Sequence, residues 1–156
     1  MAGSGTAHLR DGDIVMRVEN LVMEFPVGRT GLKVHAVSGI SFDVMRGETL
    51  GLVGESGCGK STTGKAMMQI PRPTSGSVKL DGLELTTLGN EELRSARTKM
   101  QMIFQDPISS LNPRRIVRDS VREPLDVWGR GSKAEREALV DRVLESVGID
   151  PQRASE

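Results

Sequence analysis

The sequence has little cysteine, few aromatic residues and no long apolar run. Its single cysteine, Cys58, excludes an internal disulfide and a cysteine-based zinc site. Apolar runs such as residues 50–54 are far shorter than the roughly 20 residues of a membrane helix, so we expect no membrane span. Lysine plus arginine and aspartate plus glutamate each number 21, and this balance does not indicate a strongly basic, nucleic-acid-binding protein.

The beginning of the chain is rich in glycine and polar residues. We expect residues 1–13 to form a flexible N-terminus. This segment carries no apolar region typical of a secretory signal, so the chain is expected to work in the cytoplasm.

Apolar patterning predicts several strands in the first half of the chain. Residues 14–24 cluster Ile, Val, Met and Leu in short runs, and a second strand is expected from Val34. In residues 38–44 the apolar positions alternate with Ser41 and Asp43, which places these two on the opposite side of a half-buried antiparallel strand.

Two further segments, residues 49–53 and residues 100–104, are largely apolar. Such runs are typical of strands buried on both faces of an α/β sheet. Between them, the Asp81-Gly82 pair within residues 77–85 is a strong signal for a hairpin of two short strands.

Helical patterns follow the first buried strand and dominate the C-terminal part. Residues 60–70 predict a helix that is closed by Pro71, and residues 91–99 predict a short helix. After Pro113 the chain becomes helical and strongly charged. A capping-box pattern, Ser132 followed by Glu135, begins a helix with one apolar face formed by Leu139, Val140, Val143, Leu144 and Val147.

Residues 54–62 read GESGCGKST and match the pattern G-x-x-x-x-G-K-[ST]. The run lies between a predicted buried strand and a predicted helix, which is the context that a phosphate-binding loop requires. Its glycines let successive N–H groups point at phosphate oxygens, and the helix start adds a positive dipole end. The sequence therefore predicts a nucleotide site at Gly54, Glu55, Ser56, Gly57, Cys58, Gly59, Lys60, Ser61 and Thr62.

The side chains of this loop have distinct expected roles. Lys60 is placed to reach the β- and γ-phosphates of ATP, and the Ser61 hydroxyl can complete the coordination of Mg²⁺. Thr62 is a further phosphate donor. We interpret Cys58 as a small residue that fits the loop; the alternative hypothesis is a thiol made reactive by the helix N-terminus.

A second informative run, MIFQDPISSLNPRRIV, covers residues 102–117. A strand ending in Gln105 at this distance from Lys60 resembles the Q-loop of ABC-type ATPases. The run GETLGLVGESGCGKST from Gly47 is similar to the subfamily that drives oligopeptide and dipeptide uptake, and the likeness extends over about residues 14–152. The extended Q-loop of that subfamily is matched by Asp106, Pro107, Ser110, Leu111, Asn112, Pro113 and Arg114.

This resemblance implies an α/β fold: a P-loop NTPase (RecA-like) core with an antiparallel β subdomain and the start of an α-helical subdomain. We expect residues 14–110 to form the nucleotide-binding core and antiparallel β part, and residues 111–156 to begin the helical subdomain. The resemblance also implies import of peptides powered by MgATP at the cytoplasmic face of the cell membrane. The implied partners are transmembrane permease subunits and a second ATP-binding subunit.

Two site residues come from the resemblance. In the family Gln105 would bind Mg²⁺ or the attacking water and report the nucleotide state, which suits a neutral amide. An aromatic ring would stack on adenine, and Phe25 is the candidate because Phe42 and Phe104 lie in predicted core strands and Trp128 in the helical region. Ordinary core packing is the alternative for Phe25.

The 156 residues contain no LSGGQ-like signature, no apolar strand ending in Asp-Glu and no switch histidine of this family. Lys60 and Gln105 are thus the catalytic candidates, and we expect a truncated chain that hydrolyses negligible ATP alone. Two alternatives stay open: a nucleotide-binding fragment without hydrolysis, and a soluble ABC-type ATPase not linked to transport. Nucleic acid is not an expected partner, because acidic residues interleave with Arg114, Arg115, Arg118 and Arg122.

Overall fold

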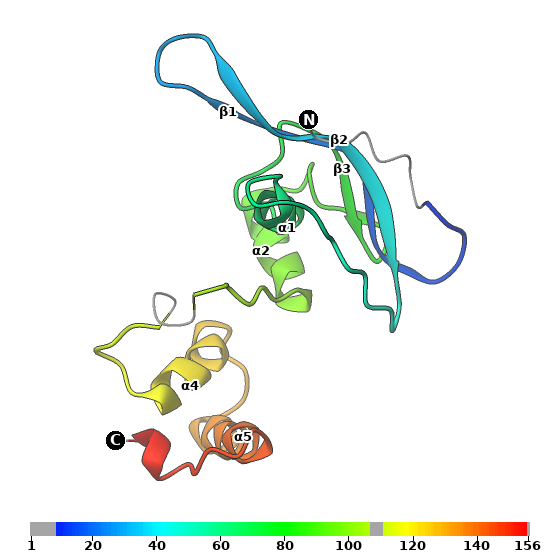
Figure 1. The fold of residues 1–156 in the computed structure, drawn as a ribbon. Coiled ribbons are helices and arrows are strands. Elements are labelled where there is room, and N and C mark those ends of the chain that lie inside the picture. The colour runs from blue at the N-terminus through cyan, green and yellow to red at the C-terminus, as the bar shows by residue number, and fades with distance from the viewer. Residues whose placement is uncertain (1–8, 107–110, 156) are drawn as a thin grey trace. The chain divides into compact units, whose positions relative to one another are not determined.

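The computed structural model describes residues 9–106 and 111–155. Contacts within the chain divide it into two compact units, one ending at Met102 and the other beginning at Ile103. The strands belong to the first unit and helices α4 and α5 to the second (Figure 1). In the described part of the chain, no helix is long and apolar enough to cross a bilayer.

The first unit is built on a four-stranded antiparallel sheet with the order β2-β1-β3-β4. The strands are β1 (Ile14–Pro26), β2 (Lys33–Met45), β3 (Ser75–Leu80) and β4 (Leu83–Glu84). The predicted antiparallel strands are thus confirmed, with β1 in the centre. The end of the β1–β2 hairpin projects beyond the rest of the unit (Figure 1).

The turn between β3 and β4 has the backbone that its sequence predicts. Asp81 and Gly82 both have positive φ angles, 47° and 79°. This pair of left-handed residues is the two-residue hairpin turn for which Asp-Gly is favoured, because glycine adopts positive φ without strain and aspartate tolerates it.

Three short helical segments complete the first unit: α1 (Lys60–Met67), α2 (Asn90–Ala96) and the 3₁₀ helix η1 (Arg97–Lys99). Ala66 of α1 and Leu93 and Ala96 of α2 pack into one apolar cluster with the inner face of the sheet. The fully buried members of that cluster include Val18, Leu21, Val78 and Leu85.

Asp43 lies on the face of β2 opposite Phe42, as predicted, and pairs with Arg17 of β1, but its side chain is fully buried, whereas the pattern of a half-buried strand predicts an exposed one. Arginines from β1 and the N-terminal segment cover it. The Arg17 guanidinium donates to Asp43 Oδ1 (2.8 Å), and the Arg10 N–H donates to Oδ2 (2.6 Å). These bonds hold the pKa of Asp43 below its usual value, and the bond from Arg17 contributes most.

Two predicted buried strands, residues 49–53 and 100–104, are not formed. Val53 is 93% exposed and Ile103 is 97% exposed. A strand requires a neighbour that takes its N–H and C=O groups, and within the described residues neither segment is paired. The apolar composition of these two segments predicted buried strands, but it does not specify the strand with which each would pair.

The second unit contains α4 (Val117–Val127), α5 (Lys133–Ser146) and the 3₁₀ helix η2 (Arg153–Ser155). The predicted capping box is confirmed, since the Glu135 N–H donates to Ser132 Oγ and the Ser132 N–H donates to Glu135 Oε2.

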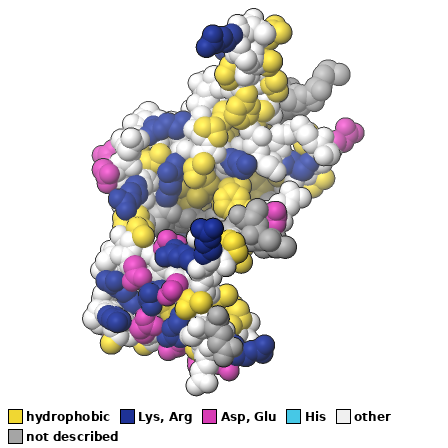
Figure 2. Space-filling model, turned by 90° about the vertical axis from the view of Figure 1, so that its left-hand side faces the viewer, with side chains coloured by type: hydrophobic (Ala, Val, Ile, Leu, Met, Phe, Trp, Pro, Cys, Tyr) yellow, Lys and Arg dark blue, Asp and Glu magenta, His cyan; other side chains and the backbone are white. Residues whose placement is uncertain are grey.

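The predicted apolar face of α5 is only partly buried. Val140 and Leu144 pack with Ala154. The remaining residues of that face are exposed: Leu139, Val143 and Val147. Hydrophobic side chains are also visible at the surface among Lys and Arg in Figure 2.

Candidate phosphate-binding site

The GESGCGKST loop leads directly into α1, which begins at Lys60 as the sequence predicts. The N–H and the hydroxyl of Thr63 both donate to the Gly59 carbonyl, at 2.8 and 2.9 Å. The first N–H groups of a helix have no acceptor within the helix. Those of Lys60, Ser61 and Thr62 are therefore available to a ligand at this end of α1. Such a helix start attracts anions.

Two glycines of the loop are required by close approach. Gly59 has a φ of 95°, and a Cβ at this position would lie 2.2 Å from the Ala36 carbonyl oxygen of β2. A Cβ at Gly54 would lie 2.6 Å from Cys58 Sγ. A larger residue at Gly59 would push the loop away from β2, and one at Gly54 would push against the Cys58 side chain and open the loop. The glycine pattern thus fixes a tight loop against the sheet.

The Lys60 ammonium is held within the loop. Its Nζ donates to the carbonyls of Gly54 (2.7 Å) and Glu55 (2.6 Å) and lies 3.5 Å from Cys58 Sγ. Phosphate oxygens would compete with these neutral carbonyls for the same protons, and a charged acceptor forms the stronger bond. Lys60 is therefore positioned to bind an anionic ligand at the loop.

A cavity of about 310 Å³ adjoins the loop. Its apolar wall comes from β2 and from the segment before the loop, and its polar part from the loop and α1. The residues that line it are Ala36, Val37, Ser38, Ile40, Leu52, Val53, Gly54, Cys58, Gly59, Lys60 and Thr63.

The donors of this site fit a phosphate chain. The first N–H groups of α1 and the Lys60 ammonium could donate to phosphate oxygens, and the exposed Ser61 hydroxyl lies at the start of α1. Among the described residues no group of three or more His, Cys, Asp or Glu could hold a metal ion.

Phe25 does not line this cavity, and Gln105 belongs to the other unit of the chain. Phe25 is near the end of β1, 40% exposed, and pairs with Val34 across the hairpin. Gln105 is exposed and belongs to the second unit. In the run after it, Pro107 and Ser110 are outside the described residues, while Asn112 Oδ1 accepts the Arg114 N–H at 3.0 Å.

Sequence reasoning missed three residues that hold the two ends of α1: Thr63 at its start, and Gln69 and Arg97 at its C-terminal end. Thr63 had a local signal, because a threonine in a helix can bond the carbonyl four residues earlier. Gln69 and Arg97 had none: the Arg97 guanidinium donates to the carbonyls of Met68 and Gln69, a contact across 28 or 29 residues of chain.

Comparison with protein-family models gives a match over residues 37–156 to the family described as ABC transporter. The matched region includes the phosphate-binding loop, Gln105 and both helices of the second unit. The chain belongs to the ABC transporter family.

Named relatives of this ABC transporter chain include the glutathione import ATP-binding protein GsiA. The chain is 46% identical over 150 residues to GsiA of Escherichia coli O157:H7 and 45% identical to that of strain K12. Each alignment covers 92% of this chain and 24% of GsiA. The chain therefore spans about a quarter of the length of these relatives.

Solved structures of ABC cassettes share the fold. The dimeric cassette MJ0796 bound to ADP and Pi matches with a TM-score of 0.75 and 24% identity, over 90% of this chain and 60% of that one. The cbiO1 structure from Clostridium perfringens matches with a TM-score of 0.69 and 27% identity, over 88% and 52% of the two chains. The expected fold class, part of a P-loop ABC cassette, is confirmed.

Proposed function

We propose that this chain is part of an ATP-binding subunit of an ABC transporter, in which residues 54–62 bind the phosphates of MgATP. The observation that carries the proposal is the loop itself. Gly59 packs against β2, α1 begins at Lys60, and the ammonium lies among the loop carbonyls. These features bring the first N–H groups of α1 and the Lys60 ammonium to one loop, which supports phosphate binding there.

Each loop residue has a distinct part in this proposal. Lys60 exchanges the carbonyls of Gly54 and Glu55 for phosphate oxygens, while the N–H groups of Ser61 and Thr62 donate from the helix start. Bound Mg²⁺ would neutralise phosphate charge, with the Ser61 hydroxyl and Gln105 as its protein ligands. We further propose that Phe25 stacks on adenine; its exposed ring on β1 supports this role.

For the whole protein we propose hydrolysis of MgATP coupled to import of peptides. GsiA is named for import of glutathione, a tripeptide, and this similarity supports the substrate class. The proposed partners are transmembrane permease subunits and a second ATP-binding subunit at the cytoplasmic face of the membrane. The cassette MJ0796 is described as dimeric, which supports the second of these partners.

Hydrolysis needs a carboxylate that orients or deprotonates the attacking water. We assign no such residue within the 156 residues, so we propose that this chain alone binds MgATP and turns over a negligible amount. Hydrolysis at the rate of an intact ABC ATPase by the chain alone would contradict this part of the proposal.

A titration with a fluorescent ATP analogue in the presence of Mg²⁺ tests the binding site. The 156-residue chain should bind the analogue, and Lys60→Ala should weaken binding by at least about tenfold because charge-assisted bonds to phosphate are lost. Lys65→Ala, an exposed lysine on the same helix, is the matched control and should bind as the parent does. Equal affinity of Lys60→Ala and the parent would refute the proposal.

A further inference from the structure

The C-terminal end of α1 is closed by a residue in a left-handed conformation. Gln69 has a φ of 59°. Its N–H donates to the Ala66 carbonyl (2.9 Å), and the Ile70 N–H donates to the Lys65 carbonyl (2.9 Å). This pair of bonds is the Schellman motif, which usually has glycine at the position of Gln69. The end of the helix therefore carries backbone strain that a glycine would not have.

The side chain of Gln69 is buried at the same place, with only 3% of its surface exposed. Its Nε2 donates to the Ala66 carbonyl (2.9 Å), but its Oε1 has no hydrogen-bond partner within the described structure. A buried acceptor without a donor is destabilising. A strained backbone and an unsatisfied oxygen together require other interactions to hold this end of α1 in place.

Arg97 supplies such an interaction. Its guanidinium donates from Nε to the Met68 carbonyl (3.0 Å) and from a terminal nitrogen to the Gln69 carbonyl (2.8 Å). These carbonyls lie just beyond the last turn of α1. A positive charge at a helix C-terminus is also favourable because the helix dipole is negative there. Arg97 thus makes a two-point contact at the end opposite the phosphate loop.

Arg97 can act as a fixed support because its own element is anchored. It begins η1, immediately after α2, whose Leu93 and Ala96 are buried in the core of the first unit. The other end of α1 is fixed by the approach of Gly59 to Ala36. At 1.5 Å per residue the eight-residue helix is about 12 Å long. Release of one end would therefore tilt the N–H groups at the other.

We propose that Arg97, acting on the Gln69 turn, is a positioning residue for nucleotide binding: it holds α1 so that its first N–H groups meet the phosphates. The inference rests on the proposed ATP site at residues 54–62. It adds a residue distant in the sequence from that loop and outside any phosphate contact. Small displacements of binding groups have large effects on ligand interactions, so a contact at the far end of α1 controls affinity.

Two substitutions and one control test this role in the full 156-residue chain. Arg97→Ala removes both bonds and the charge, and we expect the affinity for a fluorescent ATP analogue to fall about tenfold. Arg97→Lys keeps the charge and one donor group, and should restore part of that affinity. Lys99→Ala, an exposed lysine in the same 3₁₀ helix, should bind as the parent does.

Backbone amide chemical shifts separate positioning from a general loss of stability. At saturating nucleotide the amides of Lys60, Ser61 and Thr62 should differ between the parent and the Arg97 variants. Parent-like affinity and parent-like bound-state shifts in Arg97→Ala would overturn the inference. If that variant fails to fold, the same two results in Arg97→Met, which keeps the length of the side chain but neither its charge nor its donors, would overturn it. A parent chain that binds no nucleotide would instead refute the proposed ATP site.

Discussion

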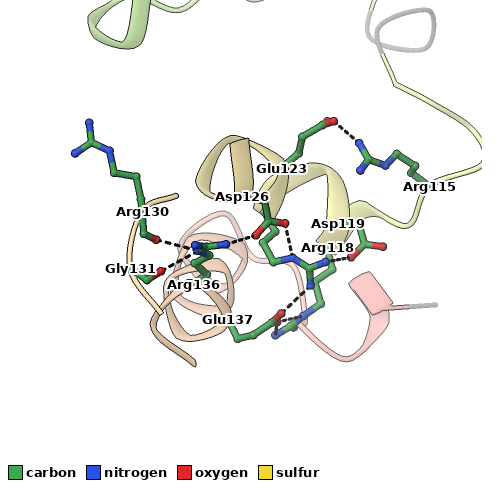
Figure 3. Close-up of polar contacts among 10 residues, drawn as sticks. Arg115, Arg118, Asp119, Glu123, Asp126, Arg130, Gly131, Arg136 and Glu137 are labelled. Carbon is green, nitrogen blue, oxygen red and sulfur yellow. Dashed lines mark hydrogen bonds and ion pairs between the residues drawn. The ribbon is translucent and has the colours of Figure 1, made fainter. Parts of the chain in front are cut away.

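The two units of the molecule are held together in different ways. Among the described residues, the unit that ends at Met102 has a core of twelve buried apolar residues, most of them from the sheet, α1 and α2. The unit that begins at Ile103 has three such residues, Val140, Leu144 and Ala154. Between α4 and α5 it has instead a dense group of ion pairs (Figure 3). The first unit therefore depends on apolar burial far more than the second does.

Glu137 and Asp126 are the acceptors at the centre of the second unit's ion pairs. Glu137 accepts from Arg118 (2.8 Å) and Arg122 (2.7 Å), and Asp126 accepts from Arg122 (3.0 Å) and Arg136 (2.9 Å). These bonds lower the pKa values of both carboxyl groups. The largest contribution comes from Arg118 for Glu137 and from Arg122 for Asp126. Ion pairs that are only partly buried contribute little free energy each, so we infer that these pairs set the register of the two helices more than their stability.

The largest expected effect comes from removing one buried leucine in each unit. Leu21→Ala should lower the free energy of unfolding of the first unit by about 2–5 kcal/mol, since it leaves a cavity in a large core. Leu144→Ala should lower the free energy of unfolding of the second unit by about 2 kcal/mol, near the lower end of this range, because the small core around it can relax. Hydrogen exchange measures each unit separately. Equal losses in the two units would contradict the comparison.

Acid should weaken the second unit before the first. A carboxyl group whose folded pKa is lowered stabilises the fold above its unfolded pKa, and this contribution is lost as the pH falls through the folded value. Glu137 and Asp126 should lose theirs as the pH falls through their lowered folded pKa values, and in the first unit Asp43 and Glu48, whose pKa the Arg10 hydrogen bond lowers to about 2, should do the same. The order of the two units follows from their apolar cores, because the small core of the second unit leaves less to hold it once its ion pairs are lost.

The acid transition can be followed with one intrinsic probe. Trp128, the only tryptophan in a chain without tyrosine, follows α4 and reports on the second unit. Its fluorescence should change at a higher pH than the hydrogen exchange of β1 amides, after correction for the intrinsic exchange rate. Loss of β1 protection at a higher pH than the Trp128 transition would refute this order.

A smaller effect is expected from the N-cap of α5. Ser132→Ala removes the acceptor for the Glu135 N–H and should lower the free energy of unfolding of the second unit by about 1 kcal/mol. Ser146→Ala, near the other end of α5, is a control with a hydroxyl that donates only to the Val143 carbonyl. Thermal unfolding monitored by Trp128 fluorescence compares the two. A larger loss in the control would contradict the role of the cap.

The smallest effect should follow from Glu137→Gln. This change leaves the size of the side chain but removes the charge that faces Arg118 and Arg122. The loss of stability should be greatest at low salt and should shrink as salt is added, because salt screens ion pairs that are still partly open to solvent. A loss that is independent of salt would show that these pairs act by another mechanism.

The sequence predicted those parts of the fold that depend on local backbone chemistry. Asp81-Gly82 requires a tight turn, Ser132 and Glu135 form a cap, and the helix of the phosphate loop begins at Lys60. Each of these signals acts within a few residues of chain. They were confirmed for this reason. The family was predicted from the run around Gln105 together with the loop, and the family match spans residues 37–156, which include both.

Features that depend on distant partners were not predicted. Residues 49–53 were expected to form a buried strand, but apolar composition does not specify the strand that must pair with it. Asp43 was expected on the open side of β2, yet Arg10 and Arg17 cover it. Arg97 reaches α1 across about 28 residues, and no local pattern indicates that contact. The roles of Phe25 and Gln105 stay predictions.

The most direct test of the phosphate site uses Cys58, the only cysteine of the chain, which is exposed within the loop. Its rate of alkylation reports on the occupancy of residues 54–62 alone. Saturating MgATP should slow the reaction severalfold, while adenosine, which lacks phosphates, should leave the rate unchanged. The same rate with and without MgATP would contradict the assignment of this loop as the nucleotide site.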